Sequence, residues 1–436
     1  MPNIKENIHR HIRNYPIDLL LPIIIGFVCG LEVVFIRTTI PLAFKGVLTV
    51  IGMAEHFTVP IIFGSLLIGA YLTGLLSERM KEASGVGLDV AIENYHSKAG
   101  LMPAKFIPLK YFATLFTLGS GGSGGLVGPT AAIGQGVASC FSRWFKLPPK
   151  KSRLMALCGI AACVSGLLNA PFGAAVFALE LCYLGGILYE DLIPVLLSSI
   201  SAYIMSERIV RELPFGDMLY ESHLYRSVIS DTAFQWSLDY LAYCVIAALF
   251  TTLLVILFIK SYLAFEKFNK KEIKSKYGVM LGAVLVASVA VLFFRHRIPD
   301  VLGTPDHLVE NCATGSYLLG TSLALLIGRW ITTFITIGSG GSGGLFSPTV
   351  LMGGLAGTIT ARILGLANTK VLVTTGISAA LVGVMNVPMA AIIIVIELFG
   401  ISFIIPAIIG SAIAFMLAKN FVIYPHIEKN PQYEKP

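Results

Sequence analysis

The apolar positions of this chain form long runs, and the polar positions gather between them. About 20 consecutive apolar residues span a bilayer, and residues 19–36, 236–259 and 279–294 reach or approach this length. Only 13% of the residues are charged, against about 25% in a soluble domain. The pattern predicts an all-α, polytopic integral membrane protein. No small-residue cleavage site follows the first run, so we expect a retained helix and not a signal peptide.

Other apolar runs are shorter and are interrupted by glycine or proline. Residues 61–76, 131–141 and 350–361 are examples. Short, interrupted apolar segments in matching positions of two halves indicate discontinuous helices around a site near the middle of the membrane. We therefore expect many tilted and broken helices.

The chain contains an internal repeat. The string GSGGSGGL occurs at residues 119–126 and again at 338–345, and a second pair of similar segments covers 159–181 and 376–398. Repetition at a fixed offset indicates a duplicated structural unit. We predict a first membrane repeat over residues 17–210 and a second over 211–425, separated by the polar stretch 206–235. The remaining residues, 1–16 and 426–436, are predicted to be short cytoplasmic ends without a soluble regulatory domain.

The positive charges test the orientation of the two halves. The loop at 143–153 holds five basic residues, whereas its counterpart at 361–370 holds two. Basic loops tend to stay cytoplasmic, so this asymmetry favours an inverted repeat. The net charge of +7 gathers in loops and at the amino terminus, which argues against nucleic-acid binding. We expect a bacterial or archaeal inner (plasma) membrane, with both termini cytoplasmic.

Each glycine loop leads directly into a predicted helix start that carries proline, at Pro129 and at Pro348. Glycine lets backbone amides converge, and proline is favoured in the first helical turn. A helix start presents unpaired N–H groups and the positive end of the helix dipole. Two such starts aimed at one point form an anion site without a full positive charge. Binding of this kind is weak enough to allow release along a conduction path.

Other interpretations explain less of this pattern. A flexible linker is not usually flanked by apolar helices on both sides, and a P-loop requires Lys-Ser/Thr after the glycines. Close packing through small residues accounts for some glycines, but not for two matching loops that end in proline-started helices. An intramembrane serine hydrolase needs a base beside its nucleophile. No histidine lies beside the loop serines within an apolar segment, so an enzyme is not expected. These serines are Ser120, Ser123, Ser339 and Ser342.

The seven cysteines are scattered along the chain and have no CxxC spacing. Neither a metal site nor a disulfide is predicted from this distribution. No cofactor is expected.

The loop residues resemble motifs of the CLC family of chloride channels and proton-coupled chloride exchangers. Residues 125–129 are similar to the family's GxEGP motif, and residues 344–348 are similar to its GxFxP motif. Residues 84–87 resemble the GSGxP loop, with Ala83 in place of its first glycine and Gly87 in place of its proline. Tyr424 falls where the family has its pore tyrosine. The resemblance covers about residues 18–425, including 169–171 and 298–303.

This resemblance implies a CLC-like fold with two inverted repeats, and a homodimer in which each subunit has its own anion pathway. It also implies that the hydroxyls of Ser84 and Tyr424 and the amides of Leu345 and Phe346 coordinate a central chloride. A helix cap for Ser84 and an interfacial belt position for Tyr424 are the alternatives. The remaining pore residues implied are Gly125, Leu126, Val127, Gly128 and Gly344.

Two departures from the family pattern bear on mechanism. Val127 stands where the family has its gating glutamate, and Leu181 stands at the inner proton-site position. We therefore predict passive chloride transport by a channel or uniporter, with no proton coupling. The alternative is an anion/proton antiporter that uses a different acid, such as Glu32, Glu180 or Glu397, although the last two occupy matching repeat positions that also suit a structural role. A membrane scaffold that transports nothing is a third alternative.

Overall fold

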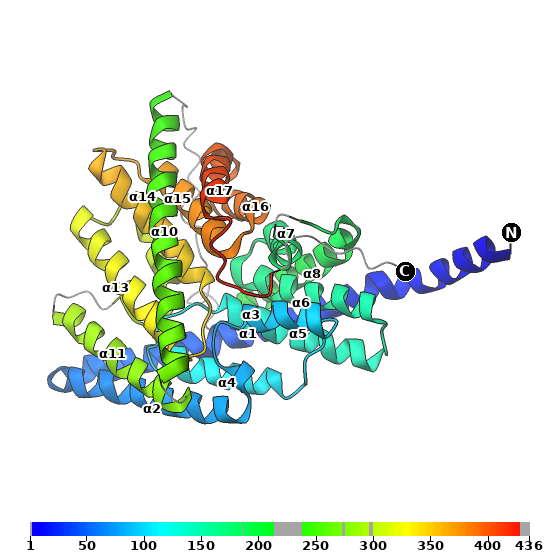
Figure 1. The fold of residues 1–436 in the computed structure, drawn as a ribbon, viewed down its shortest axis with the longest axis horizontal. Helices are drawn as coiled ribbons and strands as arrows, with labels where there is room; N and C mark the ends of the chain where they lie inside the picture. Colours follow the sequence, from blue (N-terminus) through cyan, green and yellow to red (C-terminus); the bar gives the residue numbers. More distant parts are fainter. Residues whose placement is uncertain (1, 185, 213–237, 273–274, 296–299, 428–436) are drawn as a thin grey trace.

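The computed structural model describes residues 2–184, 186–212, 238–272, 275–295 and 300–427. Within these ranges the protein is built from helices, and its only β-type pairings are two isolated bridges. In Figure 1 most helices of the first half lie toward the lower right and most of the second half toward the upper left; α1 extends below both, and α10 crosses in front of the second half. The predicted all-α fold is therefore confirmed.

The helices divide between the two halves in chain order. Those of the first half are α1 (Pro2–Met53), α2 (Thr58–Arg79), α3 (Leu88–Ser97), α4 (Phe106–Gly119), α5 (Val127–Trp144), α6 (Pro149–Leu168), α7 (Pro171–Leu181) and α8 (Leu192–Glu212). Those of the second half are α10 (Leu238–Glu272), α11 (Ser275–Arg295), α12 (Asp306–Ala313), α13 (Leu319–Gly338), α14 (Phe346–Ile363), α15 (Lys370–Met385), α16 (Pro388–Phe399) and α17 (Ile404–Ala418).

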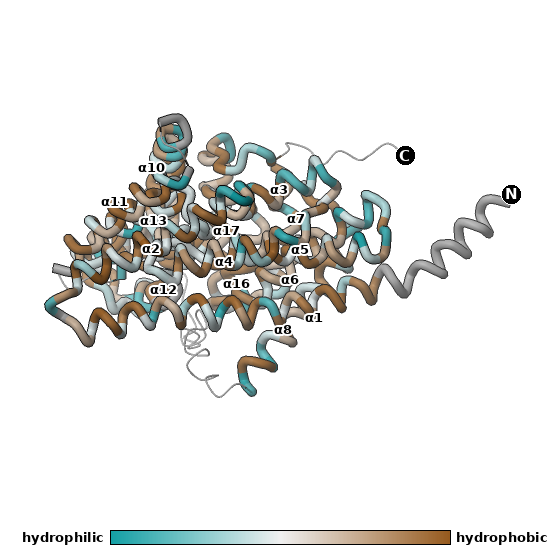
Figure 2. The backbone as a smooth tube through the Cα atoms, turned by 90° about the horizontal axis from the view of Figure 1, so that it is seen from below, coloured by the Kyte–Doolittle hydropathy of each residue, from teal (hydrophilic) through white to brown (hydrophobic). Residues whose placement is uncertain are grey.

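Eight helices of the described part are long and apolar enough to cross a membrane. The three long runs predicted from hydropathy lie in α1, α10 and α11, except for residues 236–237, which are outside the described residues. Residues 61–76 were expected to be short and interrupted, yet α2 continues for 22 residues, because neither Gly64 nor Gly69 breaks it. Residues 131–141 and 350–361 are the middles of α5 and α14, each 18 residues long. Brown, hydrophobic stretches recur along the described part of α1 (Figure 2).

Corresponding helices pack in corresponding ways. Helix α5 packs on α6 in the first half, and α14 packs on α15 in the second. In both pairs the helix backbones approach closely. A Cβ added at Gly159 would lie 2.2 Å from the Gly134 oxygen, and one added at Gly376 would lie 2.2 Å from the Gly353 oxygen. Small residues permit such close crossings in membrane helices.

The ends of the predicted units only partly coincide with helix ends. Helix α1 runs without a break from Pro2 to Met53, through the expected boundary between residues 16 and 17. Helix α8 continues to Glu212, just beyond the expected end of the first repeat. Most of the polar stretch 206–235 lies outside the described residues, as do residues 428–436 of the predicted carboxy-terminal end.

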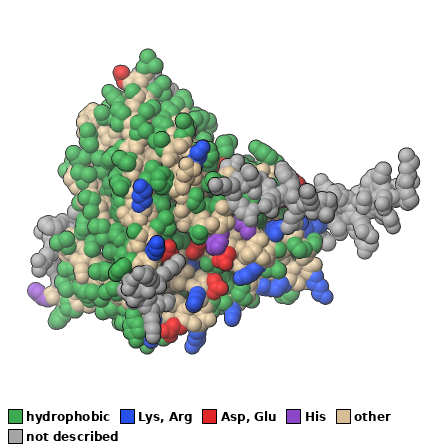
Figure 3. Space-filling view, viewed as in Figure 1, with side chains coloured by type: hydrophobic (Ala, Val, Ile, Leu, Met, Phe, Trp, Pro, Cys, Tyr) green, Lys and Arg blue, Asp and Glu red, His purple; other side chains and the backbone are tan. Residues whose placement is uncertain are grey.

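The surface matches a protein embedded in lipid. Hydrophobic side chains cover most of the visible face over the second half, whereas lysine, arginine and acidic side chains gather toward the lower right (Figure 3). Large apolar residues are exposed on the outer helices, including Leu253 of α10 at 59% and Ile327 of α13 at 53%. Exposed apolar surface of this extent is unusual for a soluble monomer.

Candidate functional site

The two glycine loops meet at the centre of the molecule. The N–H of Gly125 donates to the Gly344 oxygen at 2.8 Å, and the N–H of Gly344 donates to the Gly125 oxygen at 2.6 Å. This pairing is antiparallel, as expected where two oppositely directed repeats meet. The Ser84 loop joins them, because Gly85 donates to Gly341 at 3.2 Å and accepts from Gly343 at 3.3 Å.

Glycine is required at this junction because the backbones almost touch. A Cβ added at Gly344 would lie 2.7 Å from the Gly128 nitrogen, and one at Gly128 would lie 2.6 Å from the Val86 oxygen. Gly87 has a φ of +91° and would place its Cβ 2.9 Å from the Gly128 oxygen. Three segments predicted to form one site are therefore in direct contact.

Reciprocal hydrogen bonds show that the two halves are related by a pseudo-two-fold axis. The N–H of Ser342 donates to Thr117 Oγ1 at 3.0 Å. In the equivalent bond, the N–H of Ser123 donates to Thr336 Oγ1 at 3.1 Å. These two bonds link equivalent residues of the two halves in opposite directions.

Two of the loop serines form hydrogen bonds with threonine side chains. The hydroxyls of Ser342 and Thr114 are 2.9 Å apart, and those of Ser123 and Thr333 are also 2.9 Å apart. A serine nucleophile needs a base within hydrogen-bond reach. Here these two hydroxyls bond to threonines, in agreement with the expectation that the protein is not a serine hydrolase.

Helices α5 and α14 both begin at this junction. Their first residues are Val127 and Phe346, and neither helix start has a side-chain cap. The first helical turn is closed by Thr130 N–H bonding to Leu126 in α5, and by the equivalent bond from Thr349 in α14. Earlier N–H groups have no partner within their own helix. Two uncapped helix starts thus converge, which is the arrangement predicted for an anion site.

The side chains at these starts are shielded from solvent. Val127 is 2% exposed and Phe346 is 1% exposed. The ring of Phe346 makes a T-shaped contact with Phe177 of α7, with the centroids 5.7 Å apart. Leu181, at the end of the same helix α7, is fully buried. The expected gate and inner proton-site positions are therefore both apolar and buried.

The two predicted hydroxyl ligands donate to protein atoms in this structure. Ser84 Oγ donates to the Lys81 oxygen at 2.9 Å, and it does not cap α3, whose N-cap is Gly87. Tyr424 Oη donates to Met385 Sδ at 3.3 Å. Tyr424 is 1% exposed, so its ring occupies the core and not an interfacial belt. Each hydroxyl must turn from its present partner before it donates to an anion.

Two buried cationic side chains near the loops were not predicted from the sequence. Lys110 Nζ, on α4, donates to the Gly85 oxygen at 2.9 Å and to the Ser84 oxygen at 3.3 Å. Arg329, on α13, donates to the oxygens of Leu302 and Gly303 at 2.8 and 2.7 Å. Lys110 and Arg329 occupy equivalent positions in the two repeats. The sequence does carry a signal for them. Each is a single cation within an apolar segment, and the two are separated along the chain by the same offset as the glycine loops.

Two glutamates join the halves at a second point. Glu180, at the end of α7, accepts from the N–H groups of Met389 and Ala390 at 3.1 and 2.8 Å. Glu397, at the end of α16, accepts from those of Phe172 and Gly173 at 3.0 and 2.7 Å. Each carboxylate therefore caps the first turn of the other repeat's helix, where negative charge is favourable.

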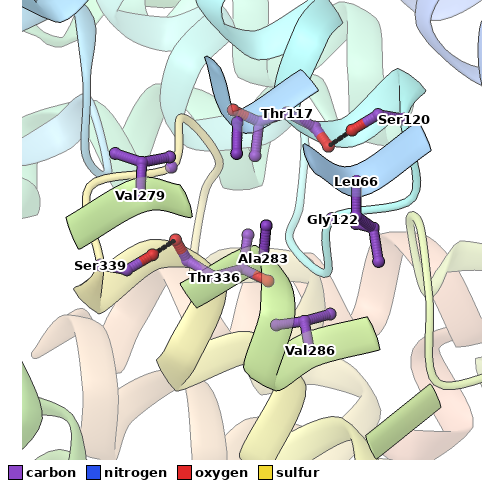
Figure 4. Close-up of a pocket in the computed structure, with 11 residues that line it drawn as sticks. Leu66, Thr117, Ser120, Gly122, Val279, Ala283, Val286, Thr336 and Ser339 are labelled. Carbon is purple, nitrogen blue, oxygen red and sulfur yellow. Dashed lines mark hydrogen bonds between the residues drawn. The ribbon is translucent and has the colours of Figure 1, made fainter. Parts of the chain in front are cut away.

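A small pocket lies beside the loops, between α2 and α11 (Figure 4). It is lined by matched residues of both halves, such as Ser120 with Ser339 and Thr117 with Thr336. The two serine hydroxyls turn away and donate to the threonine carbonyls at 3.1 and 3.0 Å. The pocket has room for about one water molecule, and none of the predicted pore residues lines it.

Comparison with known proteins agrees with this geometry. A family model described as voltage gated chloride channel matches residues 64–419. An uncharacterized protein of Methanocaldococcus jannaschii is 27% identical over 370 residues, which cover 85% of this chain and 87% of that protein. The H(+)/Cl(-) exchange transporter ClcA of Vibrio campbellii is 27% identical over 379 residues, covering 82% and 76%.

Solved structures share the fold. A crystal structure of a CLC-type fluoride/proton antiporter superposes with a TM-score of 0.81 at 21% identity, covering 96% of this chain and 98% of that one. A slow cyanobacterial Cl-/H+ antiporter superposes with a TM-score of 0.78 at 18% identity, covering 92% and 94%. The predicted CLC-like architecture of two helical repeats is confirmed.

Proposed function

Since this chain belongs to the CLC family of chloride channels and transporters, and therefore transports anions across a membrane, we propose that it is a passive, homodimeric chloride channel or uniporter. The observation that carries the proposal is the pair of buried apolar side chains at Val127 and Leu181. Valine and leucine neither titrate nor compete with an anion. The chain therefore has no carboxylate at the two positions where the family resemblance implies gating and proton transfer.

The anion pathway is supported by the junction of the loops. Two uncapped helix starts converge there, and the Lys110 ammonium is bonded to the loop that contains Ser84. Partial charges of helix starts attract an anion without trapping it. Hydroxyls of Ser84 and Tyr424, once turned from their present partners, supply the further donors proposed for a central chloride.

The bonding of Glu180 and Glu397 also favours passive transport. Both carboxylates are engaged with backbone N–H groups of the opposite repeat. A group that carries protons must gain and lose a proton in each cycle, and protonation would weaken these caps. A structural role suits both residues better than proton transfer.

An antiporter remains the second candidate, because the Vibrio relative and both similar structures are named as proton antiporters or exchangers. Glu32 of α1 is the acid that suits this role best. Its Oε1 atom is buried and, within the described part of the chain, lacks a hydrogen-bond partner. Stoichiometry separates this candidate from a channel.

The test is reconstitution of the full-length protein into chloride-loaded liposomes, with chloride efflux and external pH recorded together. A passive pathway should carry electrogenic chloride efflux that depends on a potassium ionophore to balance charge. An imposed chloride gradient should move no protons uphill. Protein-free liposomes provide the baseline for both signals.

Uphill proton movement in a fixed ratio to chloride would overturn the channel and establish the antiporter. If the protein neither transports nor binds chloride, the third interpretation, a membrane scaffold that transports nothing, is supported. Replacement of chloride by bromide, nitrate or fluoride in the same assay measures selectivity, which fold similarity alone leaves open.

A further inference from the structure

Three metal-ligating side chains outside the anion pathway meet between α1 and α6. Cys29 and Glu32 lie one helical turn apart on α1, and Cys163 comes from α6. Their ligand atoms all lie within 4.8 Å of one another. Cys163 Sγ is 3.7 Å from Glu32 Oε2.

The two cysteines of the group are buried, Glu32 is half-buried, and its carboxylate is incompletely satisfied. Both thiols are fully buried, and the other carboxylate oxygen, Glu32 Oε1, is buried with no hydrogen-bond partner in the described structure. Burial of a carboxylate oxygen without a partner is costly. An ionisable residue inside a membrane span is a functional candidate for the same reason. A bound cation would remove this cost.

The surroundings leave space for the thiol of Cys163. A Cβ added at Gly134 of α5 would lie 2.4 Å from Cys163 Sγ, so the sulfur occupies the space that a side chain at residue 134 would fill. Helix α5 is the helix that begins at Val127. The group therefore lies where α1 and α6 pack beside the helix of the proposed gate position.

We propose that Cys29, Glu32 and Cys163 form a three-ligand site for a divalent d¹⁰ metal ion of the zinc class. Thiolates select soft and borderline ions, whereas Mg²⁺ and Ca²⁺ prefer all-oxygen sites. Zn–S and Zn–O distances of about 2.3 and 2.0 Å in a tetrahedral arrangement separate ligand atoms by roughly 3.5 Å. The 3.7 Å between Cys163 Sγ and Glu32 Oε2 is close to this value.

Charge also favours a divalent ion. With both thiols and the carboxylate ionised, a divalent ion lowers the charge of the site from −3 to −1, which reduces the cost of placing these groups in an apolar environment. A fourth position stays open to water, as in other sites with three protein ligands. Bound metal would join α1 to α6. Because a ligand that binds only the folded state stabilises it, the apparent Tm should rise with metal concentration.

The experiment uses Cd²⁺ as the probe, added to the purified full-length protein in detergent with a phosphine reductant that keeps thiols reduced. Thiolate-to-cadmium charge-transfer absorption in the ultraviolet is expected to saturate at one ion per chain. A large excess of Zn²⁺ should displace the cadmium and abolish the band. Cys163→Ser should lose the band, and Glu32→Gln should weaken Cd²⁺ binding by about tenfold or more.

Cys244→Ser is the matched control, because this buried cysteine lies on α10 in the other half. It should keep the wild-type band and the Cd²⁺-dependent rise in Tm. If Cys163→Ser does not fold, Glu32→Gln, which keeps both thiols and nearly the same volume, carries the test. The proposal is overturned if wild type binds no Cd²⁺ at micromolar concentration, or if Glu32→Gln binds it as tightly as wild type.

Discussion

Val127 and Phe346 begin equivalent helices in the two repeats, but they relate differently to the family motifs that they resemble. Both side chains are buried at the junction of the glycine loops. Phe346 keeps the aromatic residue of the family motif and packs on Phe177. Val127 stands where the family resemblance implies a carboxylate, and its side chain does not titrate. At the scale of single residues, this one exchange carries the proposal of passive transport.

Val127→Glu should make chloride flux dependent on pH. A carboxylate at a helix start is stabilised in its ionised form, so at neutral pH it competes with chloride, and in acid the neutral group is released. We expect flux to rise as the pH falls from about 7.5 to about 4.5. Chloride efflux from liposomes at several pH values measures this.

Val127→Gln is the control, because glutamine has the shape of glutamate but does not titrate. Its flux should vary with pH no more than that of wild type. Equal flux for Val127→Glu in acid and at neutral pH would place residue 127 off the pathway.

Lys110 is a second residue whose charge should matter. Its ammonium bonds the carbonyls of Ser84 and Gly85 beside the proposed anion site. Lys110→Met removes the charge and about 1.5–3 kcal/mol of charge-assisted hydrogen bonding. Chloride flux at subsaturating chloride should fall by about tenfold or more.

Lys105→Met, which changes an exposed lysine just before the same helix α4, should leave flux unchanged. Isothermal titration with chloride on both variants separates loss of binding from loss of conduction. Wild-type chloride affinity in Lys110→Met would refute the electrostatic role.

At the scale of elements, the two repeats are held together by hydrogen bonds in which each repeat supplies groups to the other. Loop serines of one half bond threonines of the other, and the glutamate that ends α7 or α16 caps the start of the other. Each bond has an equivalent under the pseudo-two-fold axis. Neither half satisfies its own helix ends at these points, so the two halves stabilise each other there.

Glu180→Gln and Glu397→Gln should each destabilise the protein by about 1–2 kcal/mol, since each weakens two charge-assisted bonds to a helix start. The apparent Tm in detergent should fall for both variants by similar amounts. Chloride flux without proton movement, as proposed for the wild type, should persist in both.

Glu190→Gln provides the comparison, because Glu190 forms an exposed ion pair with Lys150 and such pairs contribute little. Its Tm should stay near that of wild type. Unchanged Tm in Glu180→Gln and Glu397→Gln would show that the caps are dispensable.

At the scale of the whole molecule, the apolar surface includes a face that suits a second copy of the chain. Phe172 of α7 and Met389 of α16 occupy equivalent repeat positions and are 54% and 52% exposed. Ile193 of α8 and Ile408 of α17, on helices that pack beside α7 and α16, are 57% and 45% exposed. A face built from matched helices is suited to the self-complementary contact of a two-fold dimer.

Light scattering in detergent should therefore give twice the chain mass of 46.9 kDa. Met389→Arg places a charge on the proposed face and should increase the monomer fraction at low protein concentration. Ile327→Arg places the same charge on α13, which is exposed elsewhere, and should remain dimeric. A monomeric wild type would refute the proposed dimer.

Much of the fold follows from local pattern. Hydropathy located α1, α10 and α11, and the repeated Gly-Pro signal located the starts of α5 and α14. These features depend on neighbouring residues, which the sequence displays directly. The length of α2 was misjudged because a glycine inside a helix lowers its stability only slightly when the surrounding membrane demands backbone hydrogen bonding.

The sequence by itself determined that the chain is a duplicated, helical membrane protein. It also predicts an anion site at the glycine loops that lacks two carboxylates of the family pattern. The tertiary structure alone decided which distant groups meet. It paired Glu180 with α16, bonded Lys110 to the Ser84 loop and brought Cys163 to Cys29 and Glu32. Those contacts join residues far apart in the chain, and only the packing of the helices determines the distances between them.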